Sequence, residues 1–260
     1  METAAGAGKM RPIEGVTERE FIKQWNGVAK LRADQIDKGE DLSFNFILLP
    51  TILELSAESD FTVAIDIGCG PGFLTRRLAL KAQRIIGIDM SNEMINVAKH
   101  RCEEIKRVQF LNLTIEDFAD SIDTSSFTLA IANMSLMTTL HLDNVINSIA
   151  RVLRPGGHFV FTITHPCFWP LYKGYASKDW FDYNKEILIE DVFKISLASP
   201  KNEQKTIHIH RPLEQYVGSL SRAGFVVDEI CEPMPTKDME AKYPEPWKYP
   251  RFLGMRCIKT

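Results

Sequence analysis

Long apolar runs are missing from this 260-residue sequence, as is an excess of charge of one sign. No stretch approaches the roughly 18 consecutive apolar residues of a membrane-spanning helix. The 31 Lys and Arg residues nearly balance the 34 Asp and Glu residues, for a formal net charge of −3. Such a chain has no overall field that would attract nucleic acid or an anionic membrane, so we expect neither as a partner.

Cysteine is also sparse, and it forms no CxxC pair: Cys69, Cys102, Cys167, Cys231 and Cys257. Scattered thiols are typical of a reduced, cytoplasmic protein rather than of a disulfide framework. Histidine, cysteine and the acidic residues show no metal-ligand spacing, so we expect no metal. The length favours a single domain over residues 16–260, after a disordered leader over residues 1–15 that lacks an apolar signal core.

What is present is a strand, glycine loop, helix and second strand over residues 63–89. The short β-branched run at residues 63–67 predicts a buried parallel strand. It leads into Gly68-Cys69-Gly70-Pro71-Gly72, a turn in which glycine permits positive φ and lets a ligand approach the backbone. Residues 73–82 show helical spacing, and the second strand that follows them ends at Asp89.

This unit predicts a nucleoside site. The loop lies at the carboxyl end of a strand, where open α/β sheets bind ligands, and the next helix offers free N–H groups. Asp89 follows Gly68 by about twenty positions, the spacing of a carboxylate that accepts hydrogen bonds from a ribose diol. A dinucleotide site would favour a third glycine at position 73, which is Phe73 here.

The pattern D-x-G-x-G-x-G, from Asp66 through Gly72, resembles motif I of the class I S-adenosylmethionine-dependent methyltransferases. Asp89 matches the acidic residue of their second motif, and the resemblance continues through Asn133 and Met134. It implies a Rossmann-like, doubly wound α/β fold: a seven-stranded, mostly parallel sheet with helices on both faces. It also implies S-adenosylmethionine as the cofactor, released as S-adenosylhomocysteine.

The resemblance assigns the expected cofactor contacts, which fall in the glycine loop, after the next three strands and in the first helix: Asp66, Gly68, Cys69, Gly70, Gly72, Asp89, Met90, Ile115, Glu116, Asp117, Asn133 and Trp25. The family ends its third strand with an acid that binds adenine. This chain has Thr114 there, so Glu116 or Asp117 is the expected substitute. The alternatives are plain packing of Trp25 and Met90 on the core and capping of a helix by Asp117.

Two segments outside the motifs are expected to cover the site. A capping box of Thr17 and Glu20 opens a helix, which predicts a helical cap over residues 16–45. The connection over residues 166–211 is far longer than usual, as in a lid. Alternation within it predicts an inserted β-hairpin that turns at residues 199–202. Its many aromatic side chains would either form the wall of a small-molecule site or pin the lid to the domain.

Methyl transfer from a sulfonium is an in-line displacement, which needs alignment of donor and acceptor rather than a metal. A hydroxyl acceptor gains from a base, and histidine suits neutral pH. His165 and His210 are the predicted catalytic residues, because both fall at the ligand edge of the sheet. A structural histidine bonded to a loop carbonyl is the alternative for each, and we expect His141 and His208 to be solvent or packing residues. The predicted acceptor contacts are Met134, Trp169, Tyr172, Tyr175 and Arg211.

Three functions are compatible with these signals. The first is methylation of a small molecule on oxygen, with nitrogen and carbon acceptors open. The second is a nicotinamide-dependent oxidoreductase, which Phe73 disfavours. The third is a non-catalytic S-adenosylmethionine-binding protein. For each we expect a cytoplasmic monomer or homodimer.

Overall fold

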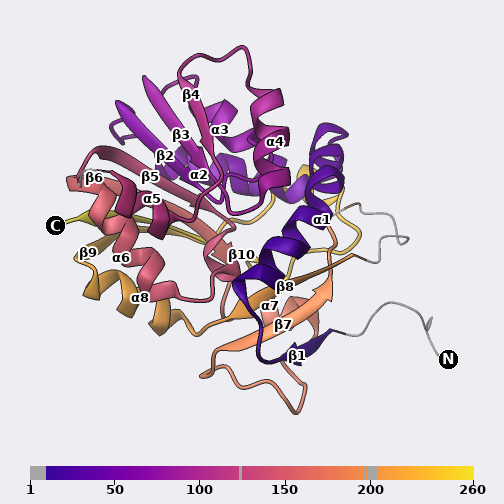
Figure 1. Ribbon diagram of the computed structural model, residues 1–260. Helices are drawn as coiled ribbons and strands as arrows, with labels where there is room; N and C mark the ends of the chain where they lie inside the picture. Colours follow the sequence, from indigo (N-terminus) through magenta and orange to yellow (C-terminus); the bar gives the residue numbers. More distant parts are fainter. Residues whose placement is uncertain (1–9, 123–124, 196, 198–203) are drawn as a thin grey trace.

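The computed structural model describes residues 10–122, 125–195, 197 and 204–260. Its centre is a seven-stranded sheet in the order β4-β3-β2-β5-β6-β10-β9 (Figure 1). The strands are β2 (Val63–Ile67), β3 (Arg84–Ile88), β4 (Val108–Leu111), β5 (Phe127–Asn133), β6 (Leu153–Thr164), β9 (Phe225–Cys231) and β10 (Phe252–Lys259). The first five are parallel, whereas β10 runs antiparallel to both β6 and β9. The predicted mostly parallel sheet is confirmed.

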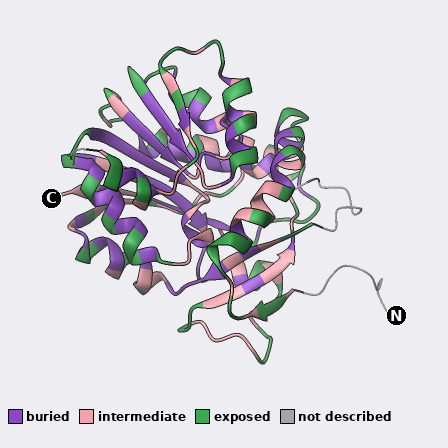
Figure 2. Ribbon diagram, in the orientation of Figure 1, coloured by how far each residue is buried: buried purple, intermediate pink, exposed green. Residues whose placement is uncertain are grey.

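Helices cover both faces of this sheet, because alternate side chains of its strands fill two separate cores. Ile65 and Ile67 of β2 pack in one core with α5 (Ile115–Ser121), α6 (Leu142–Val152) and α8 (Leu213–Arg222). Ala64 packs in the other core with α2 (Leu49–Leu55) and α3 (Phe73–Leu78). The central strands are accordingly buried on both sides (Figure 2), as parallel strands require.

Two helix starts follow their local sequence signals. Before α1 (Glu18–Asp37), Thr17 Oγ1 accepts a hydrogen bond from Glu20 N, and Thr17 N donates to Glu20 Oε2 at 2.7 Å. Before α4 (Asn92–Arg101), Ser91 Oγ accepts from Met94 N at 3.2 Å. These caps satisfy N–H groups that have no partner inside the helix. Between α1 and β2, a π-helical turn, η1 (Phe44–Leu48), continues directly into α2.

Strand β6 is longer than its sequence suggests. The sequence Arg154-Pro155-Gly156-Gly157 is typical of a turn, but the strand already begins at Leu153. The reason is pairing: Leu153 lies opposite Phe127 of β5, and the register then shifts before His158 pairs with Leu129. The paired glycines therefore form an irregular stretch within the strand, where Gly156 has a φ of +75°.

A second, three-stranded sheet with the order β1-β7-β8 lies beside α1. Strands β7 (Ile187–Val192) and β8 (Lys205–His210) are antiparallel, which confirms the predicted pairing, while the turn expected at residues 199–202 lies outside the described residues. Strand β1 (Arg11–Ile13) pairs with β7, although the sequence places it in the disordered leader. The edge of β7 that does not pair with β8 offers free backbone N–H and C=O groups, and β1 is held in place by pairing with them.

Candidate active site

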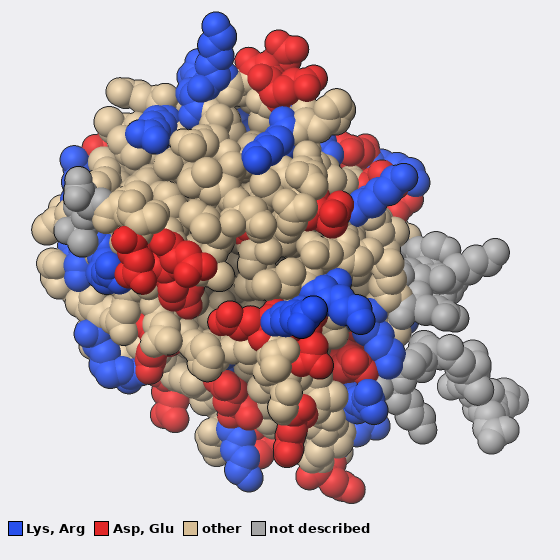
Figure 3. Space-filling view, in the orientation of Figure 1, with Lys and Arg blue, Asp and Glu red and all other residues tan. Residues whose placement is uncertain are grey.

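A cavity of about 860 Å³ opens at the carboxyl ends of β2, β3 and β5. One part, which we term the loop half, is formed by residues 66–71, 88–90, 113–116 and Asn133. The other part, the hairpin half, is formed by Trp169, Tyr172 and Lys173 of α7 (Trp169–Lys173), and by residues 191–195, 206–208, 243–245, 251 and 252. Figure 3 shows the surface hollowed near the centre of this face, with acidic and basic side chains interspersed.

The glycine loop has the backbone that its sequence predicts. Gly68 and Gly70 have φ values of +68° and +53°, in the left-handed region that favours glycine. A Cβ on Gly68 would lie 2.5 Å from Ser135 Cβ, so that position admits no side chain. A Cβ on Gly70 would meet nothing within 4 Å. The backbone of Gly70 is therefore open to a ligand in the cavity.

Asp89 lies in the loop half and is held by two backbone N–H groups. Its Oδ2 accepts from Gly70 N at 2.9 Å and its Oδ1 from Ser91 N at 2.8 Å. Each oxygen keeps acceptor capacity for a further hydrogen bond. Burial raises the pKa of Asp89 to about 6, and the two backbone hydrogen bonds oppose that shift. The carboxylate is thus fixed in orientation and able to accept from a diol.

Asp66, the first residue of the predicted motif, is fully enclosed beneath the loop. It is 1% exposed and accepts a hydrogen bond from Thr75 Oγ1 at 2.6 Å. Burial raises its pKa to about 7, and the nearby Asp89 carboxylate acts in the same direction. Asp66 links β2 to α3 through Thr75, so it holds the loop in place as well as lining the cavity.

Most of the other predicted cofactor residues also line the cavity: Cys69, Met90, Ile115, Glu116, Asn133 and Trp25. Two others are placed elsewhere. Gly72 packs against α4, where an added Cβ would lie 3.0 Å from Ala98 Cβ. Asp117 is exposed and donates its N–H to Thr114 Oγ1, which is the cap of α5. Of the two acids offered for adenine, only Glu116 lines the cavity.

Residues at the end of β5 join the two halves. Asn133 Oδ1 accepts from Thr162 Oγ1 at 2.8 Å, and the next residue, Met134, lines the cavity with a φ of +57°. A left-handed methionine is strained, and such strain is concentrated at functional sites. Its N–H donates to Thr162 O at 2.9 Å, which fixes the turn.

Some of the predicted acceptor contacts line the cavity and others do not. Trp169 and Tyr172 line the hairpin half, with their rings 5.2 Å apart. Tyr175 does not line the cavity; it is 2% exposed and stacks on Trp180 with ring centroids 5.7 Å apart. Part of the aromatic segment therefore lines the cavity, and another part packs within the segment itself.

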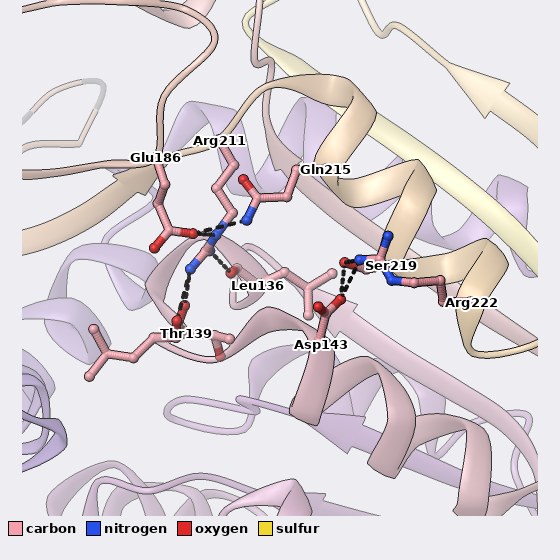
Figure 4. Close-up of polar contacts among 9 residues, drawn as sticks. Leu136, Thr139, Asp143, Glu186, Arg211, Gln215, Ser219 and Arg222 are labelled. Carbon is pink, nitrogen blue, oxygen red and sulfur yellow. Dashed lines mark hydrogen bonds and ion pairs between the residues drawn. The ribbon is translucent and has the colours of Figure 1, made fainter.

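Arg211 is buried and does not line the cavity. Figure 4 shows its polar contacts. Its Nε donates to Glu186 Oε2 at 2.5 Å, and its Nη2 donates to Thr139 O at 2.6 Å. Its Nη1 donates to Leu136 O at 3.3 Å, in the turn η2 (Leu136–Thr138). Because residues 136–140 line the cavity, Arg211 fastens one wall to the end of the hairpin.

Neither predicted catalytic histidine lines the cavity. His165 is 3% exposed, and its Nε2 lies 2.7 Å from Glu232 Oε1, while its Nδ1 accepts from Cys167 N. His210 is also buried, with its Nε2 3.0 Å from Tyr183 O. Both rings thus have hydrogen-bond partners outside the cavity.

His141 and His208, expected to be solvent or packing residues, line the cavity instead. His208 Nε2 is buried, and it has no hydrogen-bond partner among the residues that the structure describes. Burial lowers its pKa to about 4, so the ring is neutral at pH 7. His208 and His210 alternate on one strand and therefore share a face. The sequence predicted His210 of this strand as a site residue, but spacing could not show that His208 is the histidine that reaches the cavity.

The residues present fit an adenosine-containing cofactor. The open space over Gly70, the fixed carboxylate of Asp89 and the half-buried Glu116 offer a backbone platform and acceptors for sugar and base. In the described ranges, no cluster of three or more His, Cys, Asp or Glu side chains could hold a metal ion. In the same ranges, no helix has both the length and the apolar character needed to span a membrane.

Comparison with known proteins agrees with this geometry. The ubiquinone biosynthesis O-methyltransferase of Alkalilimnicola ehrlichii is 32% identical over 99 residues, which are 38% of this chain and 40% of that protein. The chain thus matches about two fifths of that relative's length.

Solved structures share the fold. A putative S-adenosylmethionine-dependent methyltransferase from Listeria monocytogenes has a TM-score of 0.61 at 23% identity, covering 81% of this chain and 98% of that one. The 1,6-didemethyltoxoflavin-N1-methyltransferase of Burkholderia thailandensis, solved with S-adenosylhomocysteine, also has a TM-score of 0.61, at 16% identity and with 96% and 95% coverage. Residues 58–214 match the family described as "Methyltransferase domain". The resemblance seen in the sequence is confirmed: the chain belongs to the methyltransferase-domain family.

Proposed function

We propose that the protein is an S-adenosylmethionine-dependent methyltransferase that methylates a small molecule, on oxygen. The observation that carries the proposal is the pairing, in one cavity, of the Asp89 carboxylate and glycine loop with a separate aromatic-walled half. The first of these suits a nucleoside, and the second suits an acceptor that the fold encloses.

In this proposal the loop half binds the methyl donor. S-adenosylmethionine, when bound, supplies an electrophilic methyl group on a sulfonium. Asp89 accepts hydrogen bonds from the ribose, and Glu116, which lines the loop half, accepts from the adenine amino group. Asn133 and Met134, at the junction of the halves, border the place where donor and acceptor meet. The protein contributes alignment, which can account for several kcal/mol of the barrier.

The hairpin half selects and orients the acceptor. Its aromatic side chains favour a small planar molecule and exclude water. The name of the Alkalilimnicola ehrlichii relative specifies O-methylation, which supports an oxygen acceptor here. A monomer or homodimer in the cytoplasm remains our prediction for its setting.

His208 is the cavity residue best placed to take a proton from an acceptor hydroxyl. Its Nε2 has no partner within the described ranges, whereas His165 and His210 would have to break existing hydrogen bonds. A low pKa does not prevent this role, because the hydroxyl becomes strongly acidic as its oxygen bonds to the methyl group.

Calorimetric titration tests the cofactor assignment. We expect S-adenosylhomocysteine to bind one site per chain and NADH to show no heat of binding. Binding of NADH in preference to S-adenosylhomocysteine would contradict the proposal and favour a nicotinamide-dependent oxidoreductase. Titration of the Asp89→Ala variant locates the binding, since only a ligand in this cavity contacts that carboxylate.

Activity is tested with a labelled methyl donor and a small-molecule extract, followed by mass spectrometry of the labelled product. His208→Gln should lower kcat by roughly 100-fold with little change in affinity for S-adenosylhomocysteine. His165→Gln and His210→Gln are the matched variants, and exposed His100→Gln is the control. Tight cofactor binding with no labelled product from any extract would favour a non-catalytic binding protein.

A further inference from the structure

Arg251 is a buried arginine in the hairpin half of the cavity. It is 7% exposed, and it precedes β10 at the ligand edge of the sheet. Its guanidinium lies 3.7 Å from the ring centroid of Tyr172 and 4.3 Å from that of Trp247. Two aromatic rings thus hold the cation in position, but neither of them neutralises its charge.

Two other cations of the cavity are already paired with acids. Arg32 forms an ion pair with Asp41, and Lys173 Nζ lies 2.6 Å from Asp191 Oδ2. For Arg251, the only hydrogen bond from the side chain within the described ranges runs from Nη2 to Glu245 O, at 3.3 Å. No carboxylate of the described residues forms an ion pair with it. The carboxylates of Glu245 and Glu240 lie in the same region without forming an ion pair with Arg251, and Glu240 Oε1 accepts from Trp247 N at 2.7 Å.

This arrangement leaves most of a planar set of donors without acceptors. Arginine carries five N–H donors, arranged to match a carboxylate with two parallel hydrogen bonds. Trp169 adds a further donor, since its Nε1 is buried and has no partner among the described residues. Trp169 and Arg251 both line the hairpin half, and both pack against Tyr172. A buried cation without a counter-ion is costly unless a ligand supplies one.

We propose that the methyl acceptor is an anion, a small planar acid whose carboxylate binds Arg251. This inference rests on the proposed function and names its substrate class. The acid group anchors the acceptor at the far wall, and the aromatic side chains hold its ring. The nucleophilic atom is then directed toward Asn133 and Met134, where the two halves meet.

Benzoate and benzamide are a matched pair of probes, because they share one shape and differ in charge. Each is titrated by calorimetry into wild-type protein saturated with S-adenosylhomocysteine. We expect benzoate to bind at least about tenfold more tightly than benzamide. Equal binding of the two probes, or no binding of benzoate, overturns the proposal. This comparison needs no substituted protein, so it does not depend on whether a variant folds.

Variants then locate the anion. Arg251→Gln should abolish the preference for benzoate, and Arg251→Lys should retain part of it, because lysine keeps the charge but loses the planar pair of donors. Exposed Arg222→Gln serves as the control for loss of one positive charge. A benzoate preference that persists in Arg251→Gln would place the anion elsewhere and overturn the proposal.

The methionine carboxylate of the donor is the other anion that Arg251 could bind. If Arg251 binds that group, Arg251→Gln will weaken S-adenosylhomocysteine binding about tenfold or more, and the acceptor assignment falls. If the acceptor assignment holds, that affinity stays the same. Failure of wild-type protein to bind S-adenosylhomocysteine would instead overturn the proposed function, so the two failures are distinct.

Discussion

The two halves of the cavity are assembled in different ways. The loop half comes from consecutive strand ends of one α/β unit, between Asp66 and Asn133. The hairpin half comes from segments separated by long stretches of chain, including α7, the β7–β8 hairpin and the segment that contains Arg251. Fixed spacing therefore dictates the first half, whereas tertiary packing dictates the second. Local sequence patterns therefore predict the loop half more readily than the hairpin half.

The largest expected effect tests whether Arg211 fastens the cavity wall at residues 136–140 to the end of the hairpin. Arg211→Met removes the hydrogen bonds to Glu186, Thr139 and Leu136 and leaves these acceptors without a donor. We expect the free energy of unfolding to fall by about 3 kcal/mol, measured by urea denaturation. The control Arg222→Met, at an exposed ion pair, should cost less than about 1 kcal/mol. Equal losses in the two variants would show that Arg211 does not fasten the wall.

The loop half is tested through its carboxylate. Asp89→Ala should weaken S-adenosylhomocysteine binding by about 1.5–3 kcal/mol, because hydrogen bonds to a charged acceptor are lost. Calorimetry measures this directly. Binding of benzoate in the hairpin half should change little, which would show that the halves are energetically separate. Unchanged affinity for S-adenosylhomocysteine would remove Asp89 from the donor site.

A smaller effect follows from pH. The pKa of Asp89 is raised to about 6, so its carboxylate is mostly charged above pH 7 and mostly protonated at pH 5. If the charged form binds the ribose, affinity for S-adenosylhomocysteine should fall about tenfold between pH 7 and pH 5. Asp89→Asn should flatten this dependence. Because burial raises the pKa of Asp66 to about 7, Asp66→Asn is the variant that separates its contribution.

The smallest effect concerns the edge of the hairpin. Arg11→Ala removes the exposed ion pair to Glu190 but keeps the backbone pairing of β1 with β7. We expect a loss of less than about 1 kcal/mol in the free energy of unfolding. A larger loss in thermal or urea denaturation would mean that the side chain, rather than the backbone, holds β1.

The sequence predicted the sheet and most of the loop half because both depend on local rules. Glycines at Gly68 and Gly70 and a carboxylate at Asp89 are required by backbone geometry and spacing, and the structure brings them to one cavity. The motif also included Gly72, which packs against α4 instead.

The hairpin half was less predictable for a physical reason. Period-2 alternation places His208 and His210 on one face, but the spacing alone does not say which of the two side chains meets the cavity. His165 and Arg211 were predicted at the ligand edge of the sheet. The side chain of each is instead hydrogen-bonded to an acid distant in sequence, Glu232 for His165 and Glu186 for Arg211. Arg251 is part of no motif, and one of its two nearest aromatic neighbours, Tyr172, lies far before it along the chain.

Strand β1 has a practical consequence for handling this protein. It lies immediately before α1, whose Phe21 packs on Ile207 and Ile209 of β8. The pairing of β1 with β7 and the packing of α1 on β8 thus join the amino-terminal segment to the hairpin. An affinity tag or cleavage site placed directly before Arg11 would interfere with the pairing of β1 and β7. A tag after Thr260 is preferable, because the chain ends there beside β9 and away from the ligand edge.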